Sequence, residues 1–126
     1  MKGWDYKDDA PVIPVTLLGK NQNIKELALV DSGAKHCVLH EDYKSNLDLD
    51  KIDESYTRGF GSKKKIPVDV CIISIQIEDK IENVECIVLK EKYFPETLPK
   101  VVLVRNLLNK YRIILDGKEK KIYIED

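Results

Sequence analysis

The sequence predicts an all-β domain, a barrel or a sandwich, with one short helix near its end. Two apolar runs, residues 27–30 and 101–104, are typical of strands buried on both faces. Residues 68–78 alternate in polarity and carry apolar side chains on both faces over part of the run, as a strand crossing a core does. Helical spacing is clear only over residues 105–111, so strands dominate the prediction.

The length, charge and cysteine content of the chain predict a single domain in a reducing compartment. A chain of 126 residues buries roughly two-thirds of its unfolded surface, enough for a single core. Its 21 basic and 22 acidic residues are interspersed, so neither nucleic acid nor a membrane surface is an expected partner. No apolar run approaches a membrane span, the N-terminus lacks a signal-peptide core, and three scattered cysteines do not suggest a disulfide framework. We therefore expect a cytoplasmic protein.

The chain starts with an arm and a hairpin. Residues 1–10 are polar with two aromatic side chains, and we expect them to dock as an arm, not as a strand, on a single domain of residues 11–126. Residues 11–18 and 24–30 are extended, and the Gly-Lys-Asn-Gln-Asn turn between them predicts a hairpin. The hairpin presents Asp31 at its far end.

Asp31 directly follows the first apolar run and precedes Ser32, Gly33 and Ala34. A strand buried on both faces would hold this carboxylate at the end of a rigid element and out of bulk water, where an unpaired charge is costly. Ser32 can donate a hydrogen bond, and Gly33 allows a tight turn with exposed N–H groups. The alternative is a plain turn that closes a strand, because Asp, Ser and Gly are common turn residues. These four residues alone leave both interpretations open.

His36, Cys37 and His40 invite a metal-site interpretation. Residues 35–40 are predicted to form a short strand, on which Cys37 points away from both histidines. A fourth ligand at workable spacing is missing, so we expect no metal and no cofactor.

The middle of the chain is expected to form a helical turn, a connector and a long hairpin. Residues 41–46 are compatible with one helical turn, and residues 47–54 with a polar connector. Two extended arms then flank Gly59, Phe60 and Gly61, where glycines on both sides of an aromatic residue favour a mobile hairpin tip. An ordinary surface hairpin is the alternative.

The C-terminal half is predicted to consist of strands around one helix. Residues 68–78 pair with residues 81–89, and Tyr93 and Phe94 pin the loop of residues 90–99 to the core.

The second apolar run leads into the short helix, in which Leu107, Leu108 and Tyr111 bury one face. An Asp-Gly turn then closes a hairpin formed by residues 112–115 and 121–124.

This order of motifs resembles the retropepsin family of aspartic proteases. The shared features are Asp-Ser-Gly-Ala after the first buried strand, the Gly-Phe-Gly hairpin, and Arg-Asn-Leu-Leu with a helix after the second buried strand; together they span about residues 11–125. The resemblance implies a closed barrel of the retropepsin type with one short C-terminal helix. It also implies an aspartic endopeptidase that cuts extended polypeptide as a homodimer, since a family chain of this length carries one catalytic loop.

The resemblance further implies roles for individual residues. Asp31 would be the catalytic carboxylate, held by residues that support the active-site loops and covered by a flap with Phe60 at its tip. The supporting residues would be Ser32, Gly33, Ala34, Arg105 and Asn106, and the flap or substrate-binding residues would be Arg58, Gly59, Phe60, Gly61 and Ser62.

Two positions depart from the family pattern. Val104 stands where members usually carry glycine and would crowd the floor of the catalytic loop. Lys35 stands where the viral members carry an acid that pairs with the arginine, and it would repel Arg105. Two alternatives therefore stay open. One is a catalytically inactive retropepsin-like domain that serves dimerisation or peptide binding, and the other is a small unrelated β-barrel binding protein in which Asp31 is only a turn residue.

Overall fold

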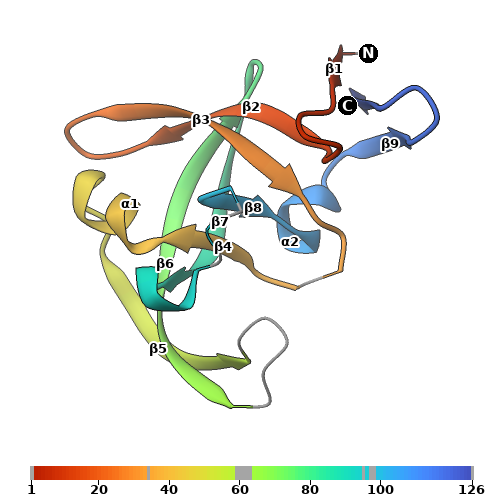
Figure 1. Cartoon of the computed structure of the whole chain (residues 1–126). Coiled ribbons are helices and arrows are strands. Elements are labelled where there is room, and N and C mark those ends of the chain that lie inside the picture. Colours follow the sequence, from red (N-terminus) through yellow and green to blue (C-terminus); the bar gives the residue numbers. More distant parts are fainter. Residues whose placement is uncertain (1, 34, 59–63, 95, 97–98, 126) are drawn as a thin grey trace.

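The computed structural model describes residues 2–33, 35–58, 64–94, 96 and 99–125. Within these ranges the chain forms ten strands, two short α-helices and one 3₁₀ turn (Figure 1). The strands are β1 (Lys2–Asp5), β2 (Val12–Leu18), β3 (Asn23–Val30), β4 (Cys37–His40), β5 (Lys51–Arg58), β6 (Lys65–Ile77), β7 (Lys80–Leu89), β8 (Val101–Leu103), β9 (Arg112–Asp116) and β10 (Lys121–Glu125). The helices are α1 (Glu41–Asn46) and α2 (Arg105–Leu108), and the 3₁₀ turn is η1 (Glu91–Tyr93). Neither these helices nor any other described segment has the length and apolarity of a membrane-spanning helix.

Six strands close into a barrel in the order β2, β3, β8, β4, β7, β6, because β6 pairs back onto β2. Among the described residues, β5 pairs with β6 alone and lies outside this ring. Fully buried aliphatic side chains fill the core, among them Ile13, Leu17, Ile75 and Leu103. The predicted all-β closed barrel is confirmed, and so are the hairpins β2–β3, β6–β7 and β9–β10.

The two apolar runs lie next to each other in the barrel. β3 and β8 pair in parallel, with Leu29 opposite Val102 and Val30 opposite Leu103. Parallel neighbours run in the same direction, so the loop that starts at Asp31 and helix α2 begin side by side. A backbone hydrogen bond fixes this junction, because Asp31 N donates to Leu103 O at 2.9 Å.

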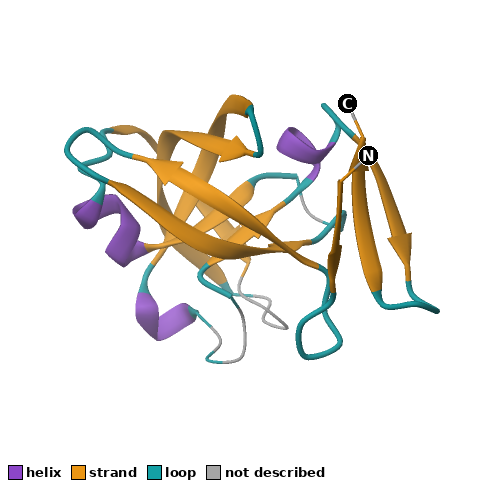
Figure 2. Ribbon diagram, turned by 90° about the horizontal axis from the view of Figure 1, so that it is seen from above, coloured by secondary structure: helices purple, strands orange, loops and turns teal. Residues whose placement is uncertain are grey.

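A second sheet of three antiparallel strands, in the order β1, β10, β9, lies beside the barrel (Figure 2). Trp4 of β1 lies opposite Ile122 of β10, which is fully buried. The expectation that residues 1–10 form an arm without a strand was therefore wrong for Lys2–Asp5. A four-residue strand with mostly exposed side chains carries no clear alternation of polarity, and its pairing depends on the open edge of β10.

Two further element boundaries differ from expectation. β5 begins at Lys51, inside the expected polar connector. Because the strand lies outside the barrel, nearly all of its side chains are exposed, and its first residues therefore resemble a polar loop in the sequence. Helix α2 ends at Leu108, and the chain continues in a tighter turn in which Tyr111 N donates to Leu108 O. Two other local expectations are confirmed. Tyr93 and Phe94 pack against the core, and α1 forms where one helical turn was expected.

Candidate active site

Two hydrogen bonds hold Asp31, one through its backbone and one through its side chain. Its backbone N–H donates to Leu103 O of β8, and its carboxylate Oδ1 accepts a hydrogen bond from Gly33 N at 2.8 Å. A carboxylate that accepts from the backbone two residues on forms an Asx turn, which fixes the side chain relative to its own backbone. The carboxylate therefore stands at the end of β3 in a defined orientation.

Gly33 leaves little room for a side chain beside this carboxylate. A Cβ atom at this position would lie 3.1 Å from Asp31 Oδ1, a tighter approach than nine in ten Cβ contacts in proteins. An alanine at this position would therefore require the carboxylate to shift by a few tenths of an ångström.

Asp31, Ser32 and Gly33 are exposed in the single chain. We expected β3 to withdraw Asp31 from bulk water, and for one subunit this was wrong. The buried part of the strand ends at Val30, and the chain leaves the barrel at the next residue. An exposed carboxylate keeps its hydration and needs no buried counter-charge. In the described part of the chain, no residue covers Asp31.

Of the remaining predicted supporting residues, the structure describes Arg105 and Asn106, which begin α2 after β8. Ala34 lies outside the described residues, Arg105 is exposed at the start of α2, and Asn106 beside it is half-buried. Val104, which was expected to crowd the loop, is fully buried in the hydrophobic core and has extended backbone angles. The core thus accommodates the side chain at the position where glycine was expected.

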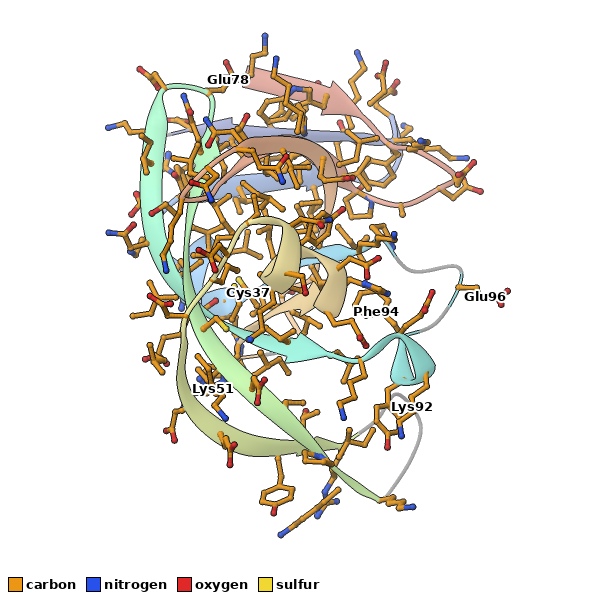
Figure 3. The ribbon with its side chains drawn as sticks, turned by 90° about the vertical axis from the view of Figure 1, so that its left-hand side faces the viewer. Cys37, Lys51, Glu78, Lys92, Phe94 and Glu96 are labelled. Atoms are coloured by element: carbon orange, nitrogen blue, oxygen red, sulfur yellow. The ribbon has the colours of Figure 1, made fainter. Side chains whose placement is uncertain are left out.

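Asn106 connects α2 to two strands of the barrel. Its Oδ1 accepts from Cys37 Sγ at 3.0 Å, and its Nδ2 donates to Glu85 O of β7 at 2.8 Å. Cys37 and Cys86 face each other across the parallel β4–β7 pair, and Figure 3 shows Cys37 among the packed side chains of the interior. A hydrogen bond from the Cys86 thiol lowers the pKa of Cys37, whereas burial raises the pKa of Cys86 well above its ordinary value.

Sequence reasoning named Asn106 but missed its partners. Cys37 was considered only as a metal ligand, and Cys86 only as part of a strand. Their contact depends on the register of β4 against β7, which no local pattern encodes. The available signal was a single cysteine in each of the two strands, followed in each by aliphatic residues.

A cavity of about 590 Å³ opens between the loop that follows Asp31 and strand β5. Exposed Lys35, buried Val38 and half-buried Ile87 are among its lining residues. Asp31 itself does not line the cavity in the single chain. The cavity is therefore bounded by later residues of the loop that carries Asp31, and not by the carboxylate itself.

The predicted flap is described only at its first residue. Arg58 ends β5, is exposed and lines the cavity, whereas Gly59, Phe60, Gly61 and Ser62 lie outside the described residues. Two exposed apolar residues of β5 that sequence reasoning did not assign to a site also line the cavity. These are Ile52, which is 50% exposed, and Tyr56, which is 69% exposed.

The histidine at the end of β4 has a structural role. His40 is buried, its Nδ1 accepts from Asp42 N at 3.1 Å at the start of α1, and its ring lies 5.3 Å from the ring of Phe94. Among the described residues, no group of three or more His, Cys, Asp or Glu side chains is arranged to hold a metal ion.

No protein-family model matches this sequence, and no curated protein matches it. Solved structures do match. A retropepsin-like aspartic protease from Rickettsia conorii superposes with a TM-score of 0.66 and 19% identity, over 98% of this chain and 88% of the other. The retroviral protease-like domain of Ddi1 from Leishmania major gives 0.59 and 14% identity, over 95% and 91%. EIAV protease in complex with the inhibitor HBY-793 gives 0.58 and 16% identity, over 82% and 88%. At these identities the likeness concerns the fold.

Proposed function

We propose that this chain, which has a retropepsin-like fold, is one subunit of a homodimeric aspartic endopeptidase with Asp31 as its catalytic carboxylate. The observation that carries the proposal is the position of Asp31. It follows buried Val30 at the end of β3, is oriented by Leu103 O and Gly33 N, and lies on the loop that bounds the cavity. One carboxylate is half of the pair that the reaction needs, so the other comes from a second copy.

Two Asp31 carboxylates that face each other across a two-fold axis share one proton, because two like charges in contact do not both ionise at low cost. The ionised carboxylate takes a proton from a water molecule as that water attacks the peptide carbonyl carbon, and the protonated one donates to the carbonyl oxygen. The carboxyl group that took the proton from water then gives it to the nitrogen as the C–N bond breaks, and the hydroxyl of the collapsing intermediate returns its proton to the other carboxylate. The hydrogen bonds from Gly33 N and to Leu103 O keep each carboxylate in place through these steps.

The proposed substrate is an extended polypeptide. Strand β5 is a sheet edge, and the cavity between it and the Asp31 loop has room for side chains of a peptide that lies alongside. Ile52 and Tyr56 supply apolar surface for such side chains, and Arg58 supplies a charge. The flap of residues 58–63, with Phe60 at its tip, would close over the peptide and exclude water.

The proposed setting is the cytoplasm, and the proposed reaction uses no cofactor. Cys37, Cys71 and Cys86 are free, buried thiols, as is usual in a reducing compartment. The reaction itself requires only water and the two carboxylates.

Asp31→Asn tests the proposal. Cleavage of an unfolded casein-like substrate should fall by about a thousandfold or more, while the melting temperature and the dimer stay as in the wild type. Asp79→Asn is the matched control, because Asp79 is an exposed acid in the turn between β6 and β7. Undiminished cleavage by Asp31→Asn would exclude the proposal.

A catalytically inactive peptide-binding domain is the second candidate, and Lys35 favours it. Lys35 lies four residues after Asp31 in the same loop and lines the cavity. A positive charge near the carboxylate pair favours ionisation of both acids and removes the shared proton. On this reading the wild type binds an extended peptide, measured by fluorescence anisotropy, without cutting it, and Tyr56→Ala weakens that binding.

A further inference from the structure

The three cysteines of this chain lie in one row across three neighbouring strands. Cys37 of β4 lies opposite Cys86 of β7, and Cys86 lies opposite Cys71 of β6. Residues directly opposite each other point to the same face of a sheet, and all three side chains are fully buried. We name these three residues the thiol row. The proposed reaction uses none of them.

The next row along the same strands lines the cavity beside β5. Val38, Ile87 and Val70 lie opposite one another in the same register, one residue along each strand from the thiol row. Successive side chains of a strand point to opposite faces, so these three point away from the thiols. All three line the cavity of about 590 Å³. The thiol row therefore lies directly beneath the floor of that cavity.

Cys37 and Cys86 are close enough for a disulfide. Neighbouring strands lie about 4.7–4.9 Å apart, and the two Cα atoms of a disulfide lie about 4.4–6.8 Å apart. The register places the two residues directly opposite each other, and their thiols share a hydrogen bond. A bond between the two sulfur atoms therefore fits the strand pair with little movement of its backbone.

Cys37 is the most reactive of the three thiols. The hydrogen bond from the Cys86 thiol lowers the pKa of Cys37 against the opposing effect of burial, and a backbone hydrogen bond with Val104 lowers it further. Burial instead raises the pKa of Cys71 and of Cys86. The thiolate is the form that attacks an oxidant, so we expect Cys37 to react first.

Cys37 also lies where a small oxidant can enter. It is the first residue of β4, and in the described part of the chain β8 pairs with Val38 and Leu39 of this strand but not with Cys37. Lys35, two residues before it, is exposed. A strand end that is paired on one side opens locally at a lower free-energy cost than a core strand does. Such an opening admits a molecule as small as hydrogen peroxide.

We propose that Cys37 and Cys86 form a reversible disulfide when the chain meets hydrogen peroxide, and that this bond releases Asn106 and with it helix α2. The Cys37 thiolate attacks one peroxide oxygen, the O–O bond breaks, and the hydroxide that leaves becomes water with the proton that Cys37 gave up. The Cys86 sulfur then attacks the sulfenic acid at Cys37, the S–S bond forms, and the hydroxyl group leaves as water with the Cys86 proton. Two thiols are thus oxidised to one disulfide, and one peroxide is reduced to two waters. Exchange with a cellular thiol restores the reduced state.

The disulfide removes the donor that holds Asn106. In the reduced chain Cys37 Sγ donates to Asn106 Oδ1 at 3.0 Å, whereas a disulfide sulfur carries no hydrogen. Asn106 then keeps the bond from Nδ2 to Glu85 O and loses its bond to β4. Asn106 belongs to α2, which follows β8, and Leu103 O at the end of β8 accepts from Asp31 N. Oxidation of the thiol row therefore loosens the helix next to the proposed catalytic loop.

Mass spectrometry of the folded wild type, treated with millimolar hydrogen peroxide, tests the disulfide. The chain should lose the mass of two hydrogen atoms, dithiothreitol should restore them, and peptide mapping should link Cys37 to Cys86. Cys71→Ser is the matched control and should lose the same mass, whereas Cys37→Ser and Cys86→Ser should form no disulfide within the chain. A link between Cys71 and Cys86 in the wild type, or no disulfide after prolonged treatment, overturns the proposal. The mapping uses the wild type alone, so it does not depend on the folding of a variant.

Hydrogen exchange tests the release of α2. The amides of Leu107 and Leu108 donate to Val104 O, and we expect them to exchange at least about fivefold faster in the oxidised than in the reduced wild type. The amides of the β2–β3 hairpin should keep their rates. Asn106→Ala lacks the bond that oxidation removes, so peroxide should change the exchange of its helix less. Equal α2 exchange in the reduced and the fully oxidised wild type overturns the proposed release.

The effect of the disulfide on cleavage rests on the proposed function. Oxidised wild type should cut a casein-like substrate at least about fivefold more slowly than reduced wild type, and dithiothreitol should reverse the change. Mass and hydrogen exchange do not depend on cleavage, so the two proposals fail separately. A chain that forms the disulfide and loosens α2 but cuts nothing removes the proposed function alone. An active enzyme whose thiols resist peroxide, or whose cleavage rate is the same in both states, removes this switch alone.

Discussion

Replacing Asn106 by alanine should loosen α2 from the barrel by an amount that the structure allows us to estimate. The change removes the bond from Nδ2 to Glu85 O and the bond from Cys37 Sγ to Oδ1. A neutral hydrogen bond contributes about 1 kcal/mol net, and a thiol is a weak donor that contributes less. Together the two bonds predict a loss of about 1–2 kcal/mol in the free energy of unfolding, or a melting temperature lower by about 4–8 °C for a chain of this size.

Urea unfolding followed by circular dichroism measures this loss. Asn109→Ala is the matched control, because Asn109 is an exposed asparagine at the C-cap of the same helix. Asn106→Asp separates the two bonds: it keeps Oδ1 but turns an acceptor toward Glu85 O, so it should be at least as destabilising as Asn106→Ala. Equal unfolding midpoints for Asn106→Ala and Asn109→Ala would refute the reasoning.

Three other outcomes follow from the geometry. Gly33→Ala should lower cleavage by about tenfold or more at nearly unchanged melting temperature, because the added Cβ would lie 3.1 Å from Asp31 Oδ1; wild-type kcat/KM in this variant contradicts the account. Cys86→Ser should reduce the loss of stability at alkaline pH. Burial raises the folded-state pKa of Cys86 well above 9.0, so the contribution of this thiol to the free energy of unfolding is present below its unfolded-state pKa and is lost as pH rises. The unfolding midpoints at about pH 8 and about pH 10 should therefore differ less in the variant than in the wild type. His40→Ala should cost about 1 kcal/mol or more in thermal unfolding, because Nδ1 no longer accepts from Asp42 N at the start of α1.

The local elements of the fold could be predicted because their signals are contained in short segments. The turn after Leu18, the Asp-Gly turn after Leu115 and the alternation through β6 each specify a hairpin without reference to the rest of the chain. The place of β8 between β3 and β4 could not be derived in this way. It joins segments more than sixty residues apart in sequence, and only the resemblance to a known family implied it.

The same distinction between local and long-range contacts applies to the candidate site. The turn at Asp31 and Gly33 is a local feature, and the sequence predicted both residues. The contact between Cys37 and Asn106 spans 69 positions and depends on the register of β4, so the sequence predicted Asn106 without its partner. Val104 shows the opposite error, because a family pattern predicted crowding at a position where the core of this chain holds the side chain.

The exposure of Asp31 contradicts the burial that the sequence predicted for it, and the proposed function gives a reason. The run from Leu27 to Val30 predicted a shielded acid, yet Asp31 is exposed in the single chain. That prediction assumed that the chain itself covers the carboxylate, whereas in the proposed homodimer the Asp31 loop of a second copy covers it. The exposure of Asp31 in one chain therefore does not count against its proposed role as one of a pair of shielded acids.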